Sequence, residues 1–243
     1  MHRKTTPRTP AALILLIAIL AIAIPVILNQ WVFVVRNVVV NGSGNIPAEE
    51  VIRLSKIDMG GKLRKIDVEQ IARHAESDGR FAFESLEVHY SNTVVLNVRM
   101  RTHDALTLQG SKIVVMDSDG YVISVHDQVP LENVPYVTNL KISAYTIGRQ
   151  IDADADRIAG MKAIVEAIKS VNVARYVSEV NVLDPNHLEI ISRTGIYVKL
   201  GDASNMENKI TWMAAALADL ESKGQTSGTL DVASGTKADF SAG

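Results

Sequence analysis

Residues 66–101 read IDVEQIARHAESDGRFAFESLEVHYSNTVVLNVRMR, and this stretch decides the fold of the first half of the chain. Asp67 and Gln70, three residues apart, form a capping-box-like pair that predicts the start of a helix. Apolar and polar side chains then alternate with period two over residues 86–90 and 94–100, which predicts two strands joined by a tight turn. The stretch therefore predicts a helix followed by a pair of strands.

The residues before this stretch add one strand and one helix. Residues 32–40 are rich in β-branched side chains and predict a strand, which ends at the turn NGSGN, residues 41–45. Pro47 with Glu49 and Glu50 predicts the first turn of a short helix, because proline fits there and carboxylates favour the positive end of the helix dipole. The predicted order is strand, helix, helix, strand, strand, which is an α+β arrangement.

An apolar segment, AALILLIAILAIAIPVIL (residues 11–28), lies near the N-terminus and has no charged or polar side chain. As a helix it would span roughly 27 Å, close to the roughly 30 Å hydrocarbon core of a bilayer. We therefore expect a transmembrane helix over residues 11–30 after a cytoplasmic tail, residues 1–10, which is basic and lacks acidic residues. The side chains expected to anchor it are Leu13, Ile14, Leu15, Leu16, Ile17, Ile19, Leu20, Ile22, Ile24, Val26, Ile27 and Leu28.

A cleaved signal peptide is the alternative interpretation of the same segment. The basic start, the apolar core and the small-x-small triplet Ala21-Ile22-Ala23 fit that pattern. However, apolar residues continue through Leu28, where a cleaved signal usually becomes polar, and this favours a retained anchor.

The composition excludes several classes of function. The 243 residues carry a formal net charge of −2, so the sequence has no basic excess with which to bind nucleic acid. There is no cysteine, which excludes a disulfide framework and any thiolate metal site or nucleophile. Only 5% of the residues are aromatic, and β-branched side chains are abundant after the apolar segment, which favours sheet-rich domains.

Residues 102–232 predict a second, β-rich domain. Asp117-Ser118-Asp119-Gly120 predicts a tight hairpin turn between two strands, because Asp-Gly is a strong two-residue hairpin signal. Further strands are expected at residues 177–183, 188–192, 196–200 and 229–232.

Two amphipathic helices flank these strands. The first is expected over residues 156–169. The second should open with a capping box formed by Ser204 and Glu207. The apolar stripe expected to be buried on it consists of Ile210, Met213, Leu217 and Leu220. Residues 233–243 are mostly small and polar and are expected to be disordered.

No catalytic, cofactor-binding or metal site is predicted. Asp152, Asp154 and Asp156 alternate, but the positions where a calcium loop needs Gly and Glu hold other residues, so helix capping is favoured. Ser234 and Lys237 match the Ser-x-x-Lys motif of penicillin-binding enzymes, but they lie in a tail without apolar periodicity. The six histidines share no spacing that would place two of them on one metal.

The order strand, helix, helix, strand, strand behind one anchor resembles a POTRA domain, and residues 38–52 and 66–101 carry the likeness. The whole chain resembles the FtsQ/DivIB family of bitopic bacterial cell-division proteins through KIVVMDSDGYVISV (residues 112–125), SEVNVLDPNHLEIISRTGIYVKLGD (178–202) and TLDV (229–232). The chain departs from the family after the POTRA-like region, where Met100-Arg101-Thr102-His103 replaces Glu-Arg-x-Pro, and after Val232, where Arg and an aromatic residue often follow.

The resemblance implies a POTRA-like domain over residues 35–101 and a distal β domain over residues 102–232. It also implies a non-enzymatic scaffold in the cytoplasmic membrane, crossing it once, with its bulk outside the cytoplasm and at the septum. The implied partners are divisome proteins of the FtsB/DivIC and FtsL types, with no nucleic acid, cofactor or small-molecule substrate.

The last predicted strand is the expected partner-binding segment. As the end of a sheet it would present unpaired N–H and C=O groups to which a partner strand could add. Its residues are Thr229, Leu230, Asp231 and Val232.

The alternative function is a POTRA-containing component of a secretion or outer-membrane assembly system. About 140 residues follow the POTRA-like region, and two amphipathic helices interrupt them, which disfavours this alternative. A membrane-anchored hydrolase is disfavoured because the sequence offers no set of nucleophile, base and orienting residue.

Overall fold

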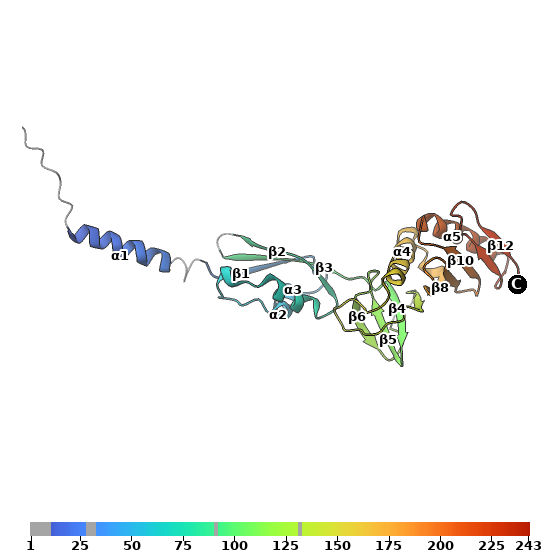
Figure 1. Ribbon diagram of the computed structural model, residues 1–243, viewed down its shortest axis with the longest axis horizontal. Coiled ribbons are helices and arrows are strands. Elements are labelled where there is room, and N and C mark those ends of the chain that lie inside the picture. Colours follow the sequence, from blue (N-terminus) through green and yellow to red (C-terminus); the bar gives the residue numbers. More distant parts are fainter. Residues whose placement is uncertain (1–10, 28–32, 90–91, 131–132) are drawn as a thin grey trace, which may run out of the picture. The chain divides into compact units, whose positions relative to one another are not determined.

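The computed structural model describes residues 11–27, 33–89, 92–130 and 133–243, and these fall into two compact units (Figure 1). The first unit holds the described residues up to Ala75 together with Phe83–Arg99. The second holds Glu76–Ala82 and Met100–Gly243. Each unit contains its own sheet, and the two are described separately.

Helix α1 (Ala11–Ile27) has 17 residues, and its large apolar side chains from Leu13 to Ile27 are 43–70% exposed. Within the described parts of the chain, no helix combines the length and apolar character that crossing a membrane would require. The structure therefore confirms a helix in the apolar segment but does not confirm the predicted membrane span. The predicted tail (residues 1–10) and the end of the predicted span, which includes Leu28, lie outside the described residues.

The first unit confirms the predicted order of elements. It contains β1 (Asn37–Asn41), α2 (Ala48–Ser55), α3 (Val68–Glu76), β2 (Phe81–His89) and β3 (Thr93–Met100), of which α3, β2 and β3 extend a few residues into the second unit. The sheet order is β1-β3-β2, and β1 runs parallel to β3 with Val39 opposite Val95. Strand β2 begins five residues earlier than the alternation predicted.

Local sequence signals account for these elements. Asp67 Oδ1 accepts the Gln70 N–H at 3.0 Å, which confirms the predicted cap of α3. Pro47 immediately precedes α2 and Glu50 lies in its first turn, as predicted. Side chains alternate between buried and partly exposed along β3, and the buried ones form the unit's core with residues of both helices. The buried apolar residues of this unit include Val35, Val51, Ile57, Ile71, Ala75, Val94, Leu96 and Val98.

The second unit contains a nine-stranded sheet covered by two helices. Its strand order is β12-β11-β10-β9-β8-β7-β4-β5-β6. The strands are β4 (Ala105–Gln109), β5 (Lys112–Met116), β6 (Val122–His126), β7 (Tyr136–Thr138), β8 (Val177–Asn181), β9 (Leu188–Ser192), β10 (Tyr197–Gly201), β11 (Thr229–Asp231) and β12 (Asp239–Ser241). The helices are α4 (Ala155–Val171) and α5 (Met206–Ser222), which pack against each other and against the sheet (Figure 1).

The short strand β7 joins two halves of this sheet, β4 to β6 on one side and β8 to β12 on the other. It pairs in parallel with β8 over three residues. With β4 it forms only the pair Leu106↔Tyr136, supported by a hydrogen bond from the Leu106 N–H to the Pro135 carbonyl at 3.0 Å. The two halves are therefore joined through few backbone bonds.

The predicted apolar stripes form the core of the second unit. On α5, the predicted residues Ile210, Met213, Leu217 and Leu220 are all buried. On α4, Met161, Ile164, Val165 and Ile168 are buried against the same cluster. The three-and-four periodicity therefore predicted both helices and the faces that they bury.

The predicted capping box at the start of α5 is wrong. The N-cap is Asn205, in the left-handed conformation with φ 50°, and it makes no side-chain cap bond. The Ser204 hydroxyl instead donates to Asp202 Oδ1 at 2.5 Å. Asp202 Oδ1 also accepts a hydrogen bond from the Lys209 ammonium at 3.0 Å, and Lys209 is only 2% exposed. A buried lysine thus holds the loop before α5 in a conformation that the capping box would not allow.

Candidate partner-binding edge

The sheet of the second unit ends at β6 on one side and at β12 on the other, and the loop at residues 148–149 covers the start of β6. At β6, the N–H of Val122 donates to the Arg149 carbonyl at 2.9 Å, and the Val122 carbonyl accepts the Gly148 N–H at 2.8 Å. At the other end, no strand of the described residues pairs with the outer side of β12. Strand β12 is therefore an open edge of this sheet over the described residues.

The prediction that residues 229–232 form the edge is wrong. Leu230 lies opposite Val198 of β10 on one side and opposite Phe240 of β12 on the other. Leu230 and Val232 are fully buried. The prediction that residues 233–243 are disordered is also wrong, because residues 239–241 form β12 and complete the sheet.

A tight reversal after β11 brings β12 beside it. The Ala233 N–H donates to Asp231 Oδ1 at 3.0 Å, and the Gly235 N–H donates to the Val232 carbonyl at 2.9 Å. Both bonds are local, so the chain turns back within a few residues and returns antiparallel to β11. The short polar stretch is thereby ordered by its pairing rather than by an apolar pattern of its own.

Two backbone hydrogen bonds between β10 and β11 fix which groups of β12 face outward. The Tyr197 N–H donates to the Gly228 carbonyl and the Val232 N–H donates to the Lys199 carbonyl, each at 3.0 Å. Since backbone groups of a strand alternate in direction, the backbone of Leu230 faces β10, whereas that of Thr229 and Asp231 faces β12. Their partners Ser241 and Asp239 then face inward, and the N–H and C=O of Phe240 face the open side.

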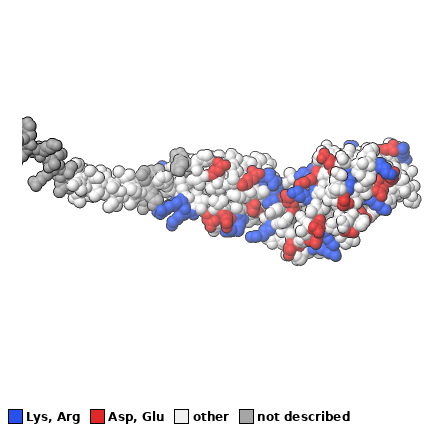
Figure 2. All heavy atoms as spheres, turned by 45° about the horizontal axis from the view of Figure 1, so that its top comes forward, with Lys and Arg blue, Asp and Glu red and all other residues white. Residues whose placement is uncertain are grey.

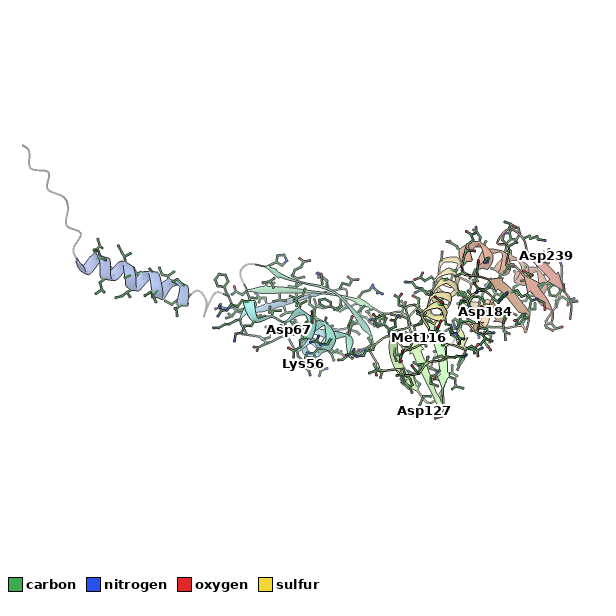
Figure 3. The ribbon with its side chains drawn as sticks, viewed as in Figure 1. Lys56, Asp67, Met116, Asp127, Asp184 and Asp239 are labelled. Carbon is green, nitrogen blue, oxygen red and sulfur yellow. The ribbon has the colours of Figure 1, made fainter. Side chains whose placement is uncertain are left out.

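The side chains of β12 hold the strand on the sheet. Phe240 is half-buried and packs against the main core, whereas Asp239 (Figure 3) and Ser241 are exposed. A Cβ on Gly228 would come within 2.7 Å of the Phe240 ring and 2.6 Å of the Ser241 carbonyl oxygen, so only glycine fits there. Lys237 pairs with Asp239 at 2.6 Å, and the hydrogen bond to this carboxylate raises the pKa of Lys237.

The face of the sheet opposite the helices carries a polar network. Asn181 donates to Glu189 at 2.9 Å, and Thr138 donates to Glu179 at 2.8 Å. Burial, together with the hydrogen bond to Glu189, raises the pKa of Tyr197 to about 12. The polar side chains on this face hydrogen-bond to one another. The groups to which a partner strand could add are the unpaired backbone groups at the edge of the sheet.

The carboxylates of Asp154 and of Asp117 in the hairpin turn have structural roles. Asp154 caps α4 by accepting the N–H groups of Asp156 and Arg157 at 3.1 Å, as predicted. Asp117 accepts the N–H groups of Asp119 and Tyr121 in the predicted hairpin turn. No group of three or more potential ligands that could hold a metal ion is found within the described ranges. Ser234 accepts the Thr236 N–H, and Lys237 is paired with Asp239, so the Ser-x-x-Lys residues do not face each other as nucleophile and base.

A buried arginine in the second unit was not predicted. Arg101 donates to Asp117 at 2.6 Å and to the Phe81 carbonyl at 3.2 Å, and its guanidinium lies 3.9 Å from the centre of the Tyr121 ring. The side chains of Arg101 and Asp117 are 3% and 5% exposed. The position lies in the stretch that departs from the family pattern, but its partners are 16 to 20 residues away in sequence, so no local pattern could reveal them.

No protein-family model matches the sequence. The chain is 20% identical over 195 residues to the cell division protein DivIB of Clostridium tetani (strain Massachusetts / E88). The match covers 80% of this chain and 73% of that protein. The chain is thus distantly similar to DivIB, in line with its resemblance to the FtsQ/DivIB family of cell division proteins.

Proposed function

We propose that this protein is a non-catalytic scaffold of the bacterial division machinery that gathers partners of the FtsB/DivIC and FtsL types at the septum. The single observation that carries this proposal is the match to DivIB over most of both chains. The first unit, over about residues 35–101, acts as a POTRA-like module, and residues 102–232 with β12 form the module that binds the partners.

The proposed scaffold is held in the cytoplasmic membrane by the apolar segment, with its N-terminus in the cytoplasm and its two units outside. Support comes from the large apolar side chains of α1 between Leu13 and Ile27, which are exposed. In water these side chains would cost free energy in proportion to their exposed area, whereas lipid removes that cost. The apolar sequence continues into residue 28, which brings the run to a length at the lower end of what membrane helices use.

The proposed partner contact is strand addition at β12. Outward-facing N–H and C=O groups at Phe240 offer hydrogen bonds that a strand of any sequence can use. The exposed side chains on either side, Asp239 and Ser241, leave room for a neighbouring strand. Residues 229–232, predicted as the contact itself, serve here as the inner strand on which β12 is built.

Replacement of Phe240 tests this mechanism, because two variants separate the side chain from the backbone. Phe240→Ala removes the ring and keeps the N–H, whereas Phe240→Pro removes both, and proline is compatible with an edge strand. We expect Phe240→Pro to bind the FtsB/DivIC-type and FtsL-type partners at least roughly fivefold more weakly than Phe240→Ala, since one hydrogen bond contributes about 1 kcal/mol.

The measurement is co-purification and titration of the full-length chain with those partners. Hydrogen exchange of the inward-facing amides of residues 239 and 241 checks that β12 stays in place in both variants. Equal affinity of the two variants would show that the edge backbone is not used.

A further inference from the structure

The first unit carries a group of basic side chains near residues 33–35, which are the first described residues after α1. Lys56, Lys62 and Lys65 line one cleft of about 150 Å³, which Asp58 and Asp67 also line. Arg64 is exposed between the last two lysines. We call Lys56, Lys62, Arg64 and Lys65 the basic patch. Figure 2 shows Lys and Arg side chains gathered at one end of this unit, and Figure 3 marks Lys56 and Asp67.

Backbone bonds fix the basic patch to the start of the folded unit. The Leu63 N–H donates to the Phe33 carbonyl at 3.1 Å, and the Val35 N–H donates to the Gly61 carbonyl at 2.9 Å. Val34 and Lys62 form an antiparallel bridge. The loop that carries the patch is therefore paired with residues 33–35, so it cannot move away from the point where the chain enters the unit.

Covalent geometry limits the distance from this loop to α1. Six peptide units separate Ile27, the end of α1, from Phe33, and a fully extended chain of that length reaches roughly 22 Å. If α1 lies in a bilayer, residues 33–35 and the loop paired with them must lie within that distance of the hydrocarbon core. The headgroup layer of each leaflet fills the first ~5–8 Å of it.

The charges of the basic patch have no partner among the described residues. None of its four side chains forms an ion pair or a side-chain hydrogen bond in the parts of the chain that the structure describes. Of the two acidic residues at the cleft, Asp67 is engaged in capping α3. Four cations against two carboxylates leave a net positive surface that is open to an anionic partner.

Exposed apolar side chains accompany these charges. Phe33 is 41% exposed, and Met59, in the loop just before Gly60, is 53% exposed. Basic side chains next to exposed aromatic and aliphatic groups are the combination found at membrane interfaces, where the cations meet headgroup phosphates and the apolar groups enter the headgroup layer.

From this we infer that the basic patch, with Phe33 and Met59, rests on anionic phospholipid headgroups of the outer leaflet and fixes the first unit against the membrane surface. The inference rests on the proposed membrane anchor. Each basic residue near an anionic surface contributes roughly fivefold in affinity, so three of them amount to a factor on the order of a hundred.

The test uses the full chain in vesicles and a single fluorophore, because the chain has no cysteine and each introduced thiol is unique. One label is placed at Met59→Cys in the basic patch loop. A matched label at Asn45→Cys lies in the exposed turn beyond the far end of β1, one strand length away. A third, at Ile19→Cys in α1, reports on insertion. Quenching by lipids with a nitroxide on the headgroup or on the acyl chain is then measured.

We expect headgroup nitroxides to quench the label at residue 59 more than the label at residue 45 in phosphatidylcholine vesicles that contain phosphatidylglycerol. This difference should disappear in phosphatidylcholine alone, at high salt, and in the variant Lys62→Glu/Arg64→Glu/Lys65→Glu. The control Lys141→Glu/Arg149→Glu/Lys199→Glu makes the same charge change at exposed residues of the second unit and should leave the quenching unchanged.

Two outcomes separate this inference from the proposed anchor. If acyl-chain nitroxides quench the label at residue 19 while the labels at residues 59 and 45 behave alike, the anchor stands and the lipid contact of the basic patch is wrong. If the label at residue 19 is not quenched, the anchor is wrong and the inference falls with it. The salt dependence of the unmutated patch decides the question even if the charge-reversed variant does not fold.

Discussion

At the scale of single residues, Arg101 carries a buried charge in the second unit that needs several partners to satisfy it. Its guanidinium is almost completely buried and joins Asp117, the Phe81 carbonyl and the Tyr121 ring. A buried charge is tolerated only where its partners satisfy it, so the loss of one member leaves another uncompensated. In the sequence, Arg101 stands out only as part of the stretch that departs from the family pattern, because nothing local distinguishes a buried arginine from an exposed one.

Replacement of Arg101 by methionine should therefore destabilise the protein strongly. Arg101→Met leaves the Asp117 carboxylate buried without its cation, and we expect a loss of about 3–5 kcal/mol in the free energy of unfolding. Arg193→Met, at an exposed arginine, should change it by less than about 0.5 kcal/mol. Urea unfolding of the full chain in detergent, followed by tryptophan fluorescence, measures both. Similar midpoints for the two variants would contradict this account of the cluster.

The lowered pKa of Asp202 predicts how the stability of the protein depends on pH. Hydrogen bonds from Ser204 and Lys209 lower the pKa of Asp202 to about 2. A carboxyl whose pKa is lower in the folded state stabilises the protein above its unfolded pKa, about 3.9, and this stabilisation is lost as the pH falls toward 2. The difference in Tm between the natural protein and Asp202→Asn should be constant above about pH 5 and shrink below about pH 4. A difference that does not vary with pH across this range would show that the carboxylate is not the stabilising group.

At the scale of elements, the helices and most strands were predictable, and the strands β4, β7 and β12 were not. The stripes of α4 and α5 and the alternation in β3 are long enough for period to identify them. Strand β4 was missed although Leu106 and Leu108 alternate in it, because residues 101–104, which separate it from β3, contain no Gly or Pro to mark a new strand. Strand β12 has three residues and one apolar side chain, and it exists only because β11 and Gly228 lie beside it. That omission misplaced the edge by one strand.

Gly228 should control whether β12 stays on the sheet. Gly228→Ala places a methyl group against the Phe240 ring and the Ser241 carbonyl oxygen, whereas Gly224→Ala changes another glycine with positive φ at a site with nothing within 4 Å. We expect Gly224→Ala to cost about 1–2 kcal/mol, from the backbone conformation alone. Gly228→Ala should in addition release β12, seen as fast hydrogen exchange at residues 239 and 241, and should weaken partner binding. Protection of these amides equal to that in Gly224→Ala would refute the steric argument.

At the scale of the whole molecule, composition and element order gave the α+β class and the strand-helix-helix-strand-strand order of the first unit. They could not give the nine-stranded order of the second sheet, because that order depends on parallel pairings between strands far apart in sequence. Tyr136 of β7, for example, pairs with Glu179 of β8, 43 residues later. Such pairings follow from the packing of α4 and α5 on the assembled sheet, which no local window contains.

The narrow junction at β7 has a mechanical consequence. If lipid holds one end of the protein and partners hold β12, as proposed, tension acts across the second sheet. Strands β4 and β7 share a single residue pair, so we expect the sheet to separate there first. Helix α4 stabilises this junction, because Lys169 forms an ion pair with Asp104 at 2.9 Å and Lys162 forms one with Asp119 at 2.7 Å. Both acidic residues lie in the β4–β6 half of the sheet. Resistance of this sheet to pulling should therefore depend on the packing of α4 and its two ion pairs as well as on the backbone hydrogen bonds between β4 and β7.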